Sequence, residues 1–378
     1  MKQLVILLFV FASTAPAASR RAKNVILFLG DAGGIPTVNA ASAYAYGEPQ
    51  RLFIQHMPHI ALMDTSTATE WVTDSAAGMS AVVTGQKTRN GVLSQSAAAL
   101  RGKKDGEILQ TILEHAEQRG LATGVMTNMS IVDATTAACY AHSNDRSRAG
   151  EIFSQVLSPR FGDGVDVLIG AGRKVVLEST AKMGLDVEAA LRQKGYTLSD
   201  TPGQIPADAR RHVALYNTST FEPWPAVERA IEILSRNSKG FFLMVEWDAH
   251  TDNLKRGLDQ LVALDDVIRR TAARMKGDTL IIYSADHSFD LRLRSGRKGE
   301  PLLPKPGVSD DNAKPNIRVD NGHTGEEVLV AAQGPGAERV HGFIPNTEVF
   351  HIMMAAYGWE APRAGSTGKA PGPQPSAR

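Results

Sequence analysis

Short apolar runs alternate with helical patterns along the whole chain, and this alternation limits the possible folds more than any other feature. It is typical of a sheet rich in parallel strands that carries helices on its faces. Strands are expected over 24–29, 122–126, 165–169, 241–245, 279–284 and 328–332. Helices are expected over 75–83, 107–119, 147–157, 225–235, 257–275 and 346–356. We therefore predict an α/β fold with a central, largely parallel β-sheet and helices on both faces.

The chain has 378 residues, of which 43% are apolar and 21% charged, as in ordinary globular proteins. We predict a single α/β catalytic domain over residues 18–360. Residues 288–320 combine charge, Pro and Gly without periodicity, so a lid loop over the site is expected there. Residues 361–378 are rich in Pro, Gly, Ser and Ala, which predicts a disordered tail.

The N-terminus has the pattern of a secretory signal peptide. Lys2 precedes an apolar run from Leu4 to Ala12, and small residues follow as far as Ala17. We predict that residues 1–17 are a signal peptide cleaved after Ala17, and that the protein is secreted or periplasmic. A membrane anchor is the alternative, but the run is much shorter than the ~20 residues that span a bilayer. No later stretch is long enough, so no membrane span is expected after cleavage.

Charge and cysteine content exclude some partners and some sources of stability. Removal of the signal peptide takes away Lys2 and leaves 40 basic against 40 acidic residues. A neutral protein lacks the broad basic surface that a nucleic-acid or anionic-membrane partner needs. Cys139 is the single cysteine, so no internal disulfide can form. Stability is expected to come from packing and from bound metals.

Carboxylate and imidazole groups stand at the ends of the predicted strands. Asp31 follows NVILFLG, Glu246 follows FFLMV, and the pair Asp286 and His287 follows TLIIYSA. His323 stands just before the strand that starts at Val328. Ligands of an open α/β sheet bind beyond the carboxyl ends of its strands. Oxygen and nitrogen donors gathered at that edge suit Zn²⁺ or Mg²⁺.

A serine and an arginine could provide the remaining chemistry. Ser75 starts a helix of small apolar residues, where free backbone N–H groups favour an alkoxide and bind phosphate. The segment after the strand at 122 offers Asp133 and Thr135 as oxygen ligands, and Arg146 as a planar fork for phosphoryl oxygens. The alternatives are that Ser75 or Asp74 is merely a helix N-cap and that Arg146 forms an ordinary surface ion pair.

Six separated motifs occur in a characteristic order. They are NVILFLGD, TDSAAGMSAVVTG, DATTAACYAHSNDR, the acidic cluster after FFLMVE, SADH and GHTGEEVLVAAQGPGAE. At these intervals the chain resembles the alkaline phosphatase family from about Asn24 to about Ala356. The resemblance implies a secreted enzyme that acts on small phosphate monoesters, with two zinc ions, one magnesium ion and usually a homodimeric assembly.

The resemblance also implies roles for single residues. Ser75 resembles the nucleophile that accepts the phosphoryl group as a phosphoserine. Arg146 resembles the arginine that grips the non-bridging oxygens of the phosphoryl group. Asp31, Asp286 and His287 resemble the ligands of the zinc ion that activates the serine.

The same resemblance implies ligands for the second zinc ion and for the magnesium ion. His323 resembles a ligand of the second zinc ion, which stabilises the leaving oxygen. Asp31, Thr135 and Glu246 resemble the magnesium ligands, and Asp133 stands beside them as a residue that holds metal-bound water. This division of work is that of a two-metal in-line displacement at phosphorus.

One segment departs from the family pattern. In the family the magnesium glutamate is commonly followed five residues later by a zinc-binding Asp and four residues after that by a His. In EWDAHTDNLK, Thr251 and Lys255 occupy these places. If the loop is three residues shorter, Asp248 and Asp252 keep the i, i+4 spacing of one helix face, and we prefer this pair as ligands. Alternatively, His250 is the ligand and Asp252 lies behind it. An oxygen-rich site would accept Mg²⁺, Mn²⁺ or Ca²⁺.

These observations predict a secreted, metal-dependent phosphatase that hydrolyses phosphate monoesters through a phosphoserine at Ser75. A phosphodiesterase of the same superfamily is the nearest alternative. A non-catalytic protein that binds phosphate or metal is another, and the altered segment from Asp248 to Asp252 is its only support.

Overall fold

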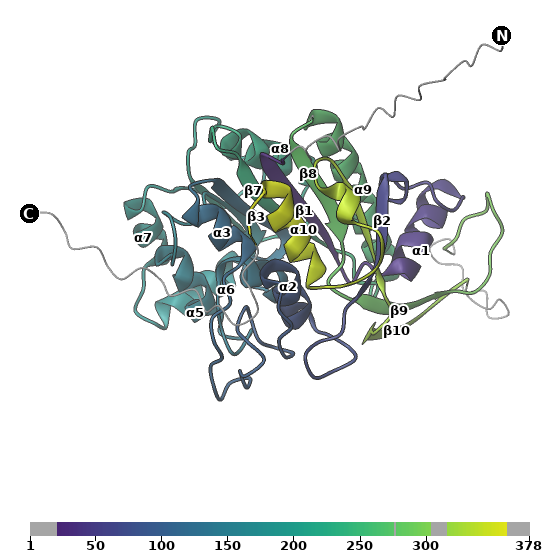
Figure 1. Cartoon of the computed structure of the whole chain (residues 1–378), viewed down its shortest axis with the longest axis horizontal. Coiled ribbons are helices and arrows are strands. Elements are labelled where there is room, and N and C mark those ends of the chain that lie inside the picture. The colour runs from purple at the N-terminus through teal and green to yellow at the C-terminus, as the bar shows by residue number, and fades with distance from the viewer. Residues whose placement is uncertain (1–20, 276, 304–315, 361–378) are drawn as a thin grey trace, which may run out of the picture.

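The computed structural model of the protein describes residues 21–275, 277–303 and 316–360. In these residues a central sheet has ten strands in the order β12-β2-β11-β8-β1-β7-β3-β4-β6-β5. Figure 1 shows this sheet together with the helices that cover it. The strands are β1 (Asn24–Asp31), β2 (His59–Asp64), β3 (Ala122–Ser130), β4 (Val167–Ala171), β5 (Thr197–Ser199), β6 (His212–Tyr216), β7 (Phe241–Asp248), β8 (Thr279–Ser284), β11 (Val328–Gln333) and β12 (Gly342–Pro345). Only β11 runs antiparallel to its two neighbours, so the predicted largely parallel sheet is confirmed.

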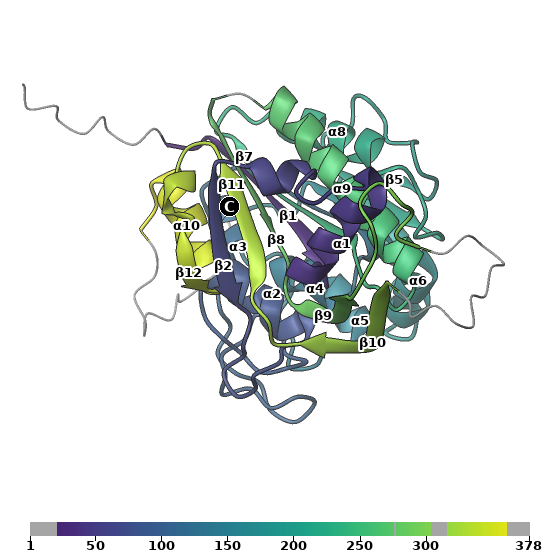
Figure 2. The same cartoon turned by 90° about the vertical axis from the view of Figure 1, so that its right-hand side faces the viewer.

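Helices cover both faces of the sheet, as predicted. On β1, Val25, Leu27 and Leu29 face one apolar cluster, while Ile26 and Phe28 face the other. The first cluster is supplied by α2 (Ser75–Thr84), α3 (Ile112–Gln118), α4 (Ala134–Tyr140), α5 (Ala149–Ser154), η2 (Gln155–Leu157), α6 (Arg173–Ala181), α7 (Val187–Gln193), η3 (Ala337–Arg339) and α10 (Glu348–Tyr357). The second is supplied by α1 (Ile35–Tyr46), η1 (Phe53–His56), α8 (Pro223–Leu234) and α9 (Leu254–Arg274). Figure 2 shows α10 on one side of the sheet and α1 and α9 on the other.

Burial on both faces explains why the central strands read as continuous apolar runs rather than as alternating ones. All eight residues of β1 and of β7 are buried. In the part of the chain that the structure describes, no helix has the length together with the apolar composition needed to cross a bilayer.

The helix predicted over 107–119 begins only at Ile112, because a capping box fixes its start. The Thr111 hydroxyl accepts a hydrogen bond from the Glu114 backbone N–H, and the Glu114 carboxylate accepts one from the Thr111 backbone N–H. This reciprocal arrangement satisfies two N–H groups that the first helical turn leaves free, so the chain before Thr111 stays irregular.

The lid loop predicted over 288–320 is wrong at both ends. Residues Ser288–Leu293 form β9 and Ile317–Thr324 form β10, which pair antiparallel in a separate small sheet beside α1 (Figure 1). In β9 the buried Phe289 and Leu291 alternate with polar residues, which is the period of a strand with one buried face. Residues 304–315 lie outside the described residues, and so do the predicted signal peptide and the predicted tail.

The strand register brings the acidic residues to one edge of the sheet. β1 lies between β7 and β8, and Asp31 at its carboxyl end pairs with Asp248 at the end of β7. Two residues earlier, Leu29 pairs with Glu246 on β7 and with Ser284 at the end of β8. Because parallel strands end at the same edge, residues from three distant parts of the chain meet there.

Candidate active site

Ser75 is the first residue of α2 and is almost completely buried. Asp74 caps the helix, since its carboxylate accepts a hydrogen bond of 3.0 Å from the Ala77 backbone N–H. The Ser75 Oγ lies 3.2 Å from Nε2 of His287, whose Nδ1 donates to the Ser288 carbonyl. The serine hydroxyl thus faces both a helix N-terminus and an imidazole nitrogen, which is the setting of an activated nucleophile.

Asp31, Asp286 and His287 form a buried cluster next to this serine. Their ligand atoms all lie within 4.8 Å of one another, and Asp31 Oδ1 is 3.3 Å from His287 Nε2. Burial opposes ionisation of Asp31, but contact with His287 and the charge of His250 hold its pKa well below the usual range. Burial and the negative charge of Asp31 raise the pKa of Asp286 to about 6. Two carboxylates this close favour a cation between them.

Glu246 near the end of β7 and Thr135 in the first turn of α4 are also completely buried. Both carboxylate oxygens of Glu246, the Thr135 hydroxyl oxygen and Asp286 Oδ2 are buried without a hydrogen bond in the described residues. Burial and the carboxylates of Asp31 and Asp133 raise the pKa of Glu246 well above its usual value. Unpaired buried oxygens cost free energy, and a hard divalent cation satisfies such oxygens. The donor set therefore fits the metal binding that the sequence predicts here.

Three histidines converge beside the carboxylates. His250, His287 and His323 each offer a ring nitrogen within 4.8 Å of the others. The rings of His287 and His323 are stacked with centroids 3.7 Å apart. His323 donates through Nδ1 to the Thr73 carbonyl at 3.0 Å, which leaves its Nε2 free. Burial and the neighbouring His287 lower the pKa of His323 and so favour the neutral ring, the form that binds metals.

The preferred pairing of Asp248 with Asp252 does not form. Asp248 is the last residue of β7 and its side chain is 7% exposed, whereas the Asp252 side chain is 54% exposed and pairs with Arg256. Asn253 caps α9, so Asp252 precedes the helix and the i, i+4 spacing has no helical meaning there. The alternative names His250 as the ligand, and the structure places a ring nitrogen of His250 within 4.8 Å of those of His287 and His323.

Arg146 is held toward the serine by two carboxylates. Its Nη1 donates to Asp74 Oδ2 at 3.1 Å and its Nη2 donates to Asp133 Oδ1 at 2.7 Å. Burial opposes its charge, but these two carboxylates raise the pKa of Arg146. Asp145 pairs instead with Arg101, so Arg146 is not part of a surface ion pair with its chain neighbour. Asp74 therefore caps the serine's helix and also orients this arginine, and the sequence predicts only the first of these roles.

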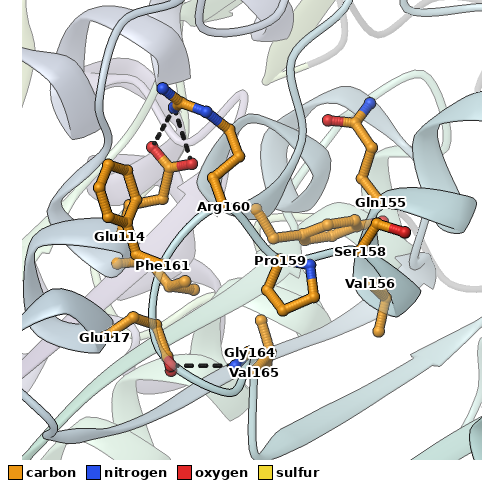
Figure 3. Close-up of a pocket in the computed structure, with 12 residues that line it drawn as sticks. Glu114, Glu117, Gln155, Val156, Ser158, Pro159, Arg160, Phe161, Gly164 and Val165 are labelled. Atoms are coloured by element: carbon orange, nitrogen blue, oxygen red, sulfur yellow. Dashed lines mark hydrogen bonds and ion pairs between the residues drawn. The ribbon is translucent and has the colours of Figure 1, made fainter. Parts of the chain in front are cut away.

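A separate cavity lies between α3 and the segment 155–165 (Figure 3). Its volume is about 30 Å³, and none of the predicted site residues is among those that line it. Arg160 pairs there with Glu114, and Glu117 accepts from the Gly164 backbone N–H (Figure 3). A volume of this size holds about one water molecule, so this cavity is not the substrate site.

The sequence matches the family model described as alkaline phosphatase over residues 22–209, 224–296 and 305–359. The alkaline phosphatase of Escherichia coli K12 is 30% identical and covers 90% of this chain and 87% of its own length. The tissue-nonspecific alkaline phosphatase isozyme of Felis catus is 29% identical and covers 93% of this chain and 87% of its own.

Solved structures agree with these matches. A mutant alkaline phosphatase of the Antarctic bacterium TAB5 with bound magnesium is 25% identical, covers 90% of this chain and 99% of its own, and has a TM-score of 0.76. The Thermus thermophilus enzyme shares the fold at 22% identity, with coverage of 94% and 96% and a TM-score of 0.77. The chain therefore belongs to the alkaline phosphatase family of metal-dependent phosphoric monoester hydrolases.

Proposed function

We propose that the protein is an exported, metal-dependent phosphatase that hydrolyses phosphate monoesters through a phosphoserine at Ser75. The observation that carries this proposal is the position of the Ser75 hydroxyl. It lies at the N-terminus of α2, 3.2 Å from His287 Nε2, and its neighbour Asp74 holds Arg146. The Ser75 hydroxyl is thus close to the N-terminus of α2 and to the ligand cluster that contains His287, and Arg146 is bound to the residue before it.

The Ser75 hydroxyl gives up its proton and its Oγ forms a bond to phosphorus, while the ester P–O bond breaks and the alcohol leaves carrying a proton. The free backbone N–H groups and the positive end of the α2 dipole stabilise the serine alkoxide and the oxygens of the phosphoryl group. His287 Nε2 faces the hydroxyl while its Nδ1 is bound to a carbonyl, so the ring is fixed in orientation. Water then releases inorganic phosphate and restores the serine.

Arg146 favours monoesters over diesters. Its fork has a fixed orientation because Asp74 and Asp133 hold one terminal nitrogen each. A planar guanidinium binds two phosphoryl oxygens at once, and a monoester offers more free non-bridging oxygens than a diester.

The metal ions proposed are two Zn²⁺ and one Mg²⁺. Asp31, Asp286 and His287 would hold one zinc, and His323 would supply a ligand of the other. Asp31, Thr135 and Glu246 would hold the magnesium, with Asp133 beside them. When bound, these ions supply positive charge to the attacking and leaving oxygens of the displacement.

Export to the periplasm or the medium is part of the proposal, and the N-terminal pattern Lys2 to Ala17 supports it. Secretion of the full chain with loss of residues 1–17, measured by mass spectrometry of the mature protein, tests this step. A homodimer, which the family resemblance implies, is tested by sedimentation of the purified protein.

The enzymatic proposal is tested with p-nitrophenyl phosphate after removal of metals. Zn²⁺, Mg²⁺, Mn²⁺ and Ca²⁺ are returned singly and in pairs, and bis-p-nitrophenyl phosphate is assayed in parallel. We expect zinc to restore monoester hydrolysis, magnesium to strengthen it, and Ser75→Ala to abolish turnover while metal content stays the same. Faster diester than monoester hydrolysis would contradict the proposal in favour of a phosphodiesterase. No turnover with any metal would leave a binding protein.

A further inference from the structure

We propose that Ser80 is a positioning residue for the phosphoryl transfer, because it holds Arg146 in place relative to Ser75 through residues 90–95. We call residues 90–95 the connecting segment, since they lie between α2 and the loop that carries Arg146. This inference rests on the proposed function, in which Ser75 is the nucleophile and Arg146 binds the phosphoryl oxygens.

The connecting segment is bound to α2 through the Ser80 hydroxyl. Ser80 Oγ donates to the Val92 carbonyl at 3.3 Å and accepts from the Ser94 backbone N–H at 2.8 Å. All three residues are completely buried, so water cannot replace these hydrogen bonds. One side chain of the nucleophile's own helix therefore satisfies two backbone groups of the connecting segment.

The connecting segment is also bound to the loop that carries Arg146. Leu93 and Ser143 exchange two backbone hydrogen bonds, of 2.8 and 3.1 Å. The Arg146 backbone N–H donates to the Gly91 carbonyl at 2.9 Å. The Gly91 N–H in turn donates to Asp74 Oδ2, the oxygen that also accepts from Arg146 Nη1. Both the backbone and the guanidinium of Arg146 thus depend on the place of the connecting segment.

Ser94 shows how firmly the connecting segment is held. It is not a glycine, yet its φ of 45° lies in the left-handed region, which is unfavourable for a residue with a side chain. Its Oγ donates to the Ala138 carbonyl at 2.6 Å, and its own carbonyl accepts from His142 Nδ1 at 2.8 Å. Such backbone strain persists only where surrounding contacts determine the conformation, and it concentrates at functional sites.

These contacts set the separation between the nucleophile and the guanidinium. Ser75 and Ser80 belong to one helix, so their separation is constant. The connecting segment relates the backbone of Arg146 to Ser80, while Asp74 sets the direction of the guanidinium. Groups that bind a reacting substrate must be held to within about 0.5 Å, so a displaced connecting segment should weaken the grip of Arg146.

The test measures binding of inorganic phosphate to the full mature chain, loaded with metal, by isothermal titration calorimetry. Wild type is compared with Ser80→Ala, Arg146→Ala and the double variant. Ser42→Ala on α1 is the matched control, because Ser42 is equally buried. Its Oγ also donates to a carbonyl, that of Glu48, and accepts from a backbone N–H, that of Arg51.

Circular dichroism and thermal unfolding verify that each variant is folded. Ser80→Cys replaces Ser80→Ala in every comparison if the alanine variant does not fold. It fills the space of the serine, but a thiol is only a weak donor and a weak acceptor.

We expect Ser80→Ala and Ser42→Ala to lose similar thermal stability, because each variant lacks the same two kinds of hydrogen bond. Only Ser80→Ala should weaken phosphate binding, by about 3–10-fold, as for residues coupled in one hydrogen-bond network. In the Arg146→Ala background, Ser80→Ala should weaken binding by less than about twofold, because the group through which it acts is absent.

Hydrogen–deuterium exchange without phosphate tests the connection itself. Residues 142–147 should exchange faster in Ser80→Ala than in wild type, and Ser42→Ala should match wild type there. Because this measurement needs no ligand, it is independent of the proposed function. Wild-type protein that binds no phosphate would contradict the proposed function, and the exchange of residues 142–147 would still decide whether Ser80 holds the loop of Arg146.

Each of three results would overturn the inference. The first is unchanged exchange of residues 142–147 in Ser80→Ala. The second is a phosphate affinity of Ser80→Ala equal to that of Ser42→Ala. The third is an equal weakening by Ser80→Ala in the presence and absence of the Arg146 side chain, which would mean that Ser80 does not act through Arg146.

Discussion

The Ser75 Oγ lies 3.2 Å from Nε2 of His287, although 212 residues separate them in the chain. α2 carries the serine, and the loop after β8 carries the histidine. The two are brought together where Gly78 of α2 meets the Asp286 carbonyl, since a Cβ on Gly78 would lie only 2.7 Å from that oxygen. The absence of a side chain at Gly78 allows the nucleophile to reach the ligand cluster.

Gly78→Ala should therefore lower both stability and turnover. Alanine normally stabilises a helix interior by about 0.5–1 kcal/mol relative to glycine, but the overlap with a backbone carbonyl costs about 1–3 kcal/mol here. Thermal unfolding and kcat measure the two effects. Gly150→Ala in α5 is the control, because its Cβ would also meet a carbonyl, that of Ser179, away from the site. Unchanged kcat in Gly78→Ala would show that the serine is positioned by other contacts.

Arg146→Ala should lower kcat/KM by about 10–150-fold, which corresponds to about 1.5–3 kcal/mol for hydrogen bonds to a charged group. Arg146→Lys should recover little, because lysine cannot present two parallel N–H groups. Inhibition by inorganic phosphate should weaken in both variants. Arg148→Ala is the control, since Arg148 is half-buried and pairs with Glu151 rather than with a site residue. Full activity in Arg146→Lys would exclude a bidentate role.

Mg²⁺ should raise the melting temperature of metal-free protein, and Glu246→Gln should remove this increase. Glu246 is a buried carboxylate without a hydrogen bond in the described residues, so a bound cation relieves an unfavourable state. Stabilisation follows mass action and reaches about 2.7 kcal/mol at a concentration 100 times the Kd. Differential scanning calorimetry across a Mg²⁺ series makes the measurement. Glu151→Gln, at an exposed position, should respond like wild type, and an unchanged response in Glu246→Gln would contradict the assignment.

Glu117→Gln should increase stability at alkaline pH. Burial and the nearby Asp166 raise the pKa of Glu117 to about 7, from an ordinary value of 4.5. Since folding favours the protonated form, the wild-type free energy of unfolding decreases as pH rises from about 4.5 to about 7. The loss is on the order of 3 kcal/mol. Glutamine stays neutral and can still meet the Thr123 hydroxyl that contacts Glu117. It can also meet the Gly164 backbone N–H, whose contact with Glu117 is drawn in Figure 3.

Urea unfolding of wild type and Glu117→Gln at pH 5 and pH 8 measures this difference. The gain of the variant over wild type should be small at pH 5 and large at pH 8. Glu107→Gln, at an exposed position, should show no such change. Equal gains at both pH values would mean that Glu117 does not titrate with a raised pKa.

The sequence was most informative where the fold obeys a general rule. Parallel strands end at one edge, so Asp31, Glu246 and Asp286 could be placed together from the apolar runs that precede them. The sequence was least informative about contacts between residues that are far apart in the chain. Asp74, which pairs with Arg146, stands 72 positions earlier, so no local sequence pattern predicts this ion pair.

The segment after β7 shows a second limit. The spacing of Asp248 and Asp252 is that of a helix face, but the chain there is still strand and loop, and α9 starts only at Leu254. Periodicity carries information only inside the element that has that period. Because β7 ends at Asp248 and α9 begins at Leu254, His250 lies beside His287 and His323, and Asp252 lies in the loop before the helix.

The central position of β1 affects how the chain can fold during synthesis. Val25 pairs with Phe242 on one side and with Leu280 on the other, so β1 has no strand neighbour until residues 241–284 have been made. Contacts between such distant positions form slowly. The sheet therefore cannot close around its middle strand while the first half of the chain emerges. A precursor that stays open this long suits the proposed export, because a chain must still be unfolded when it is threaded through a membrane pore.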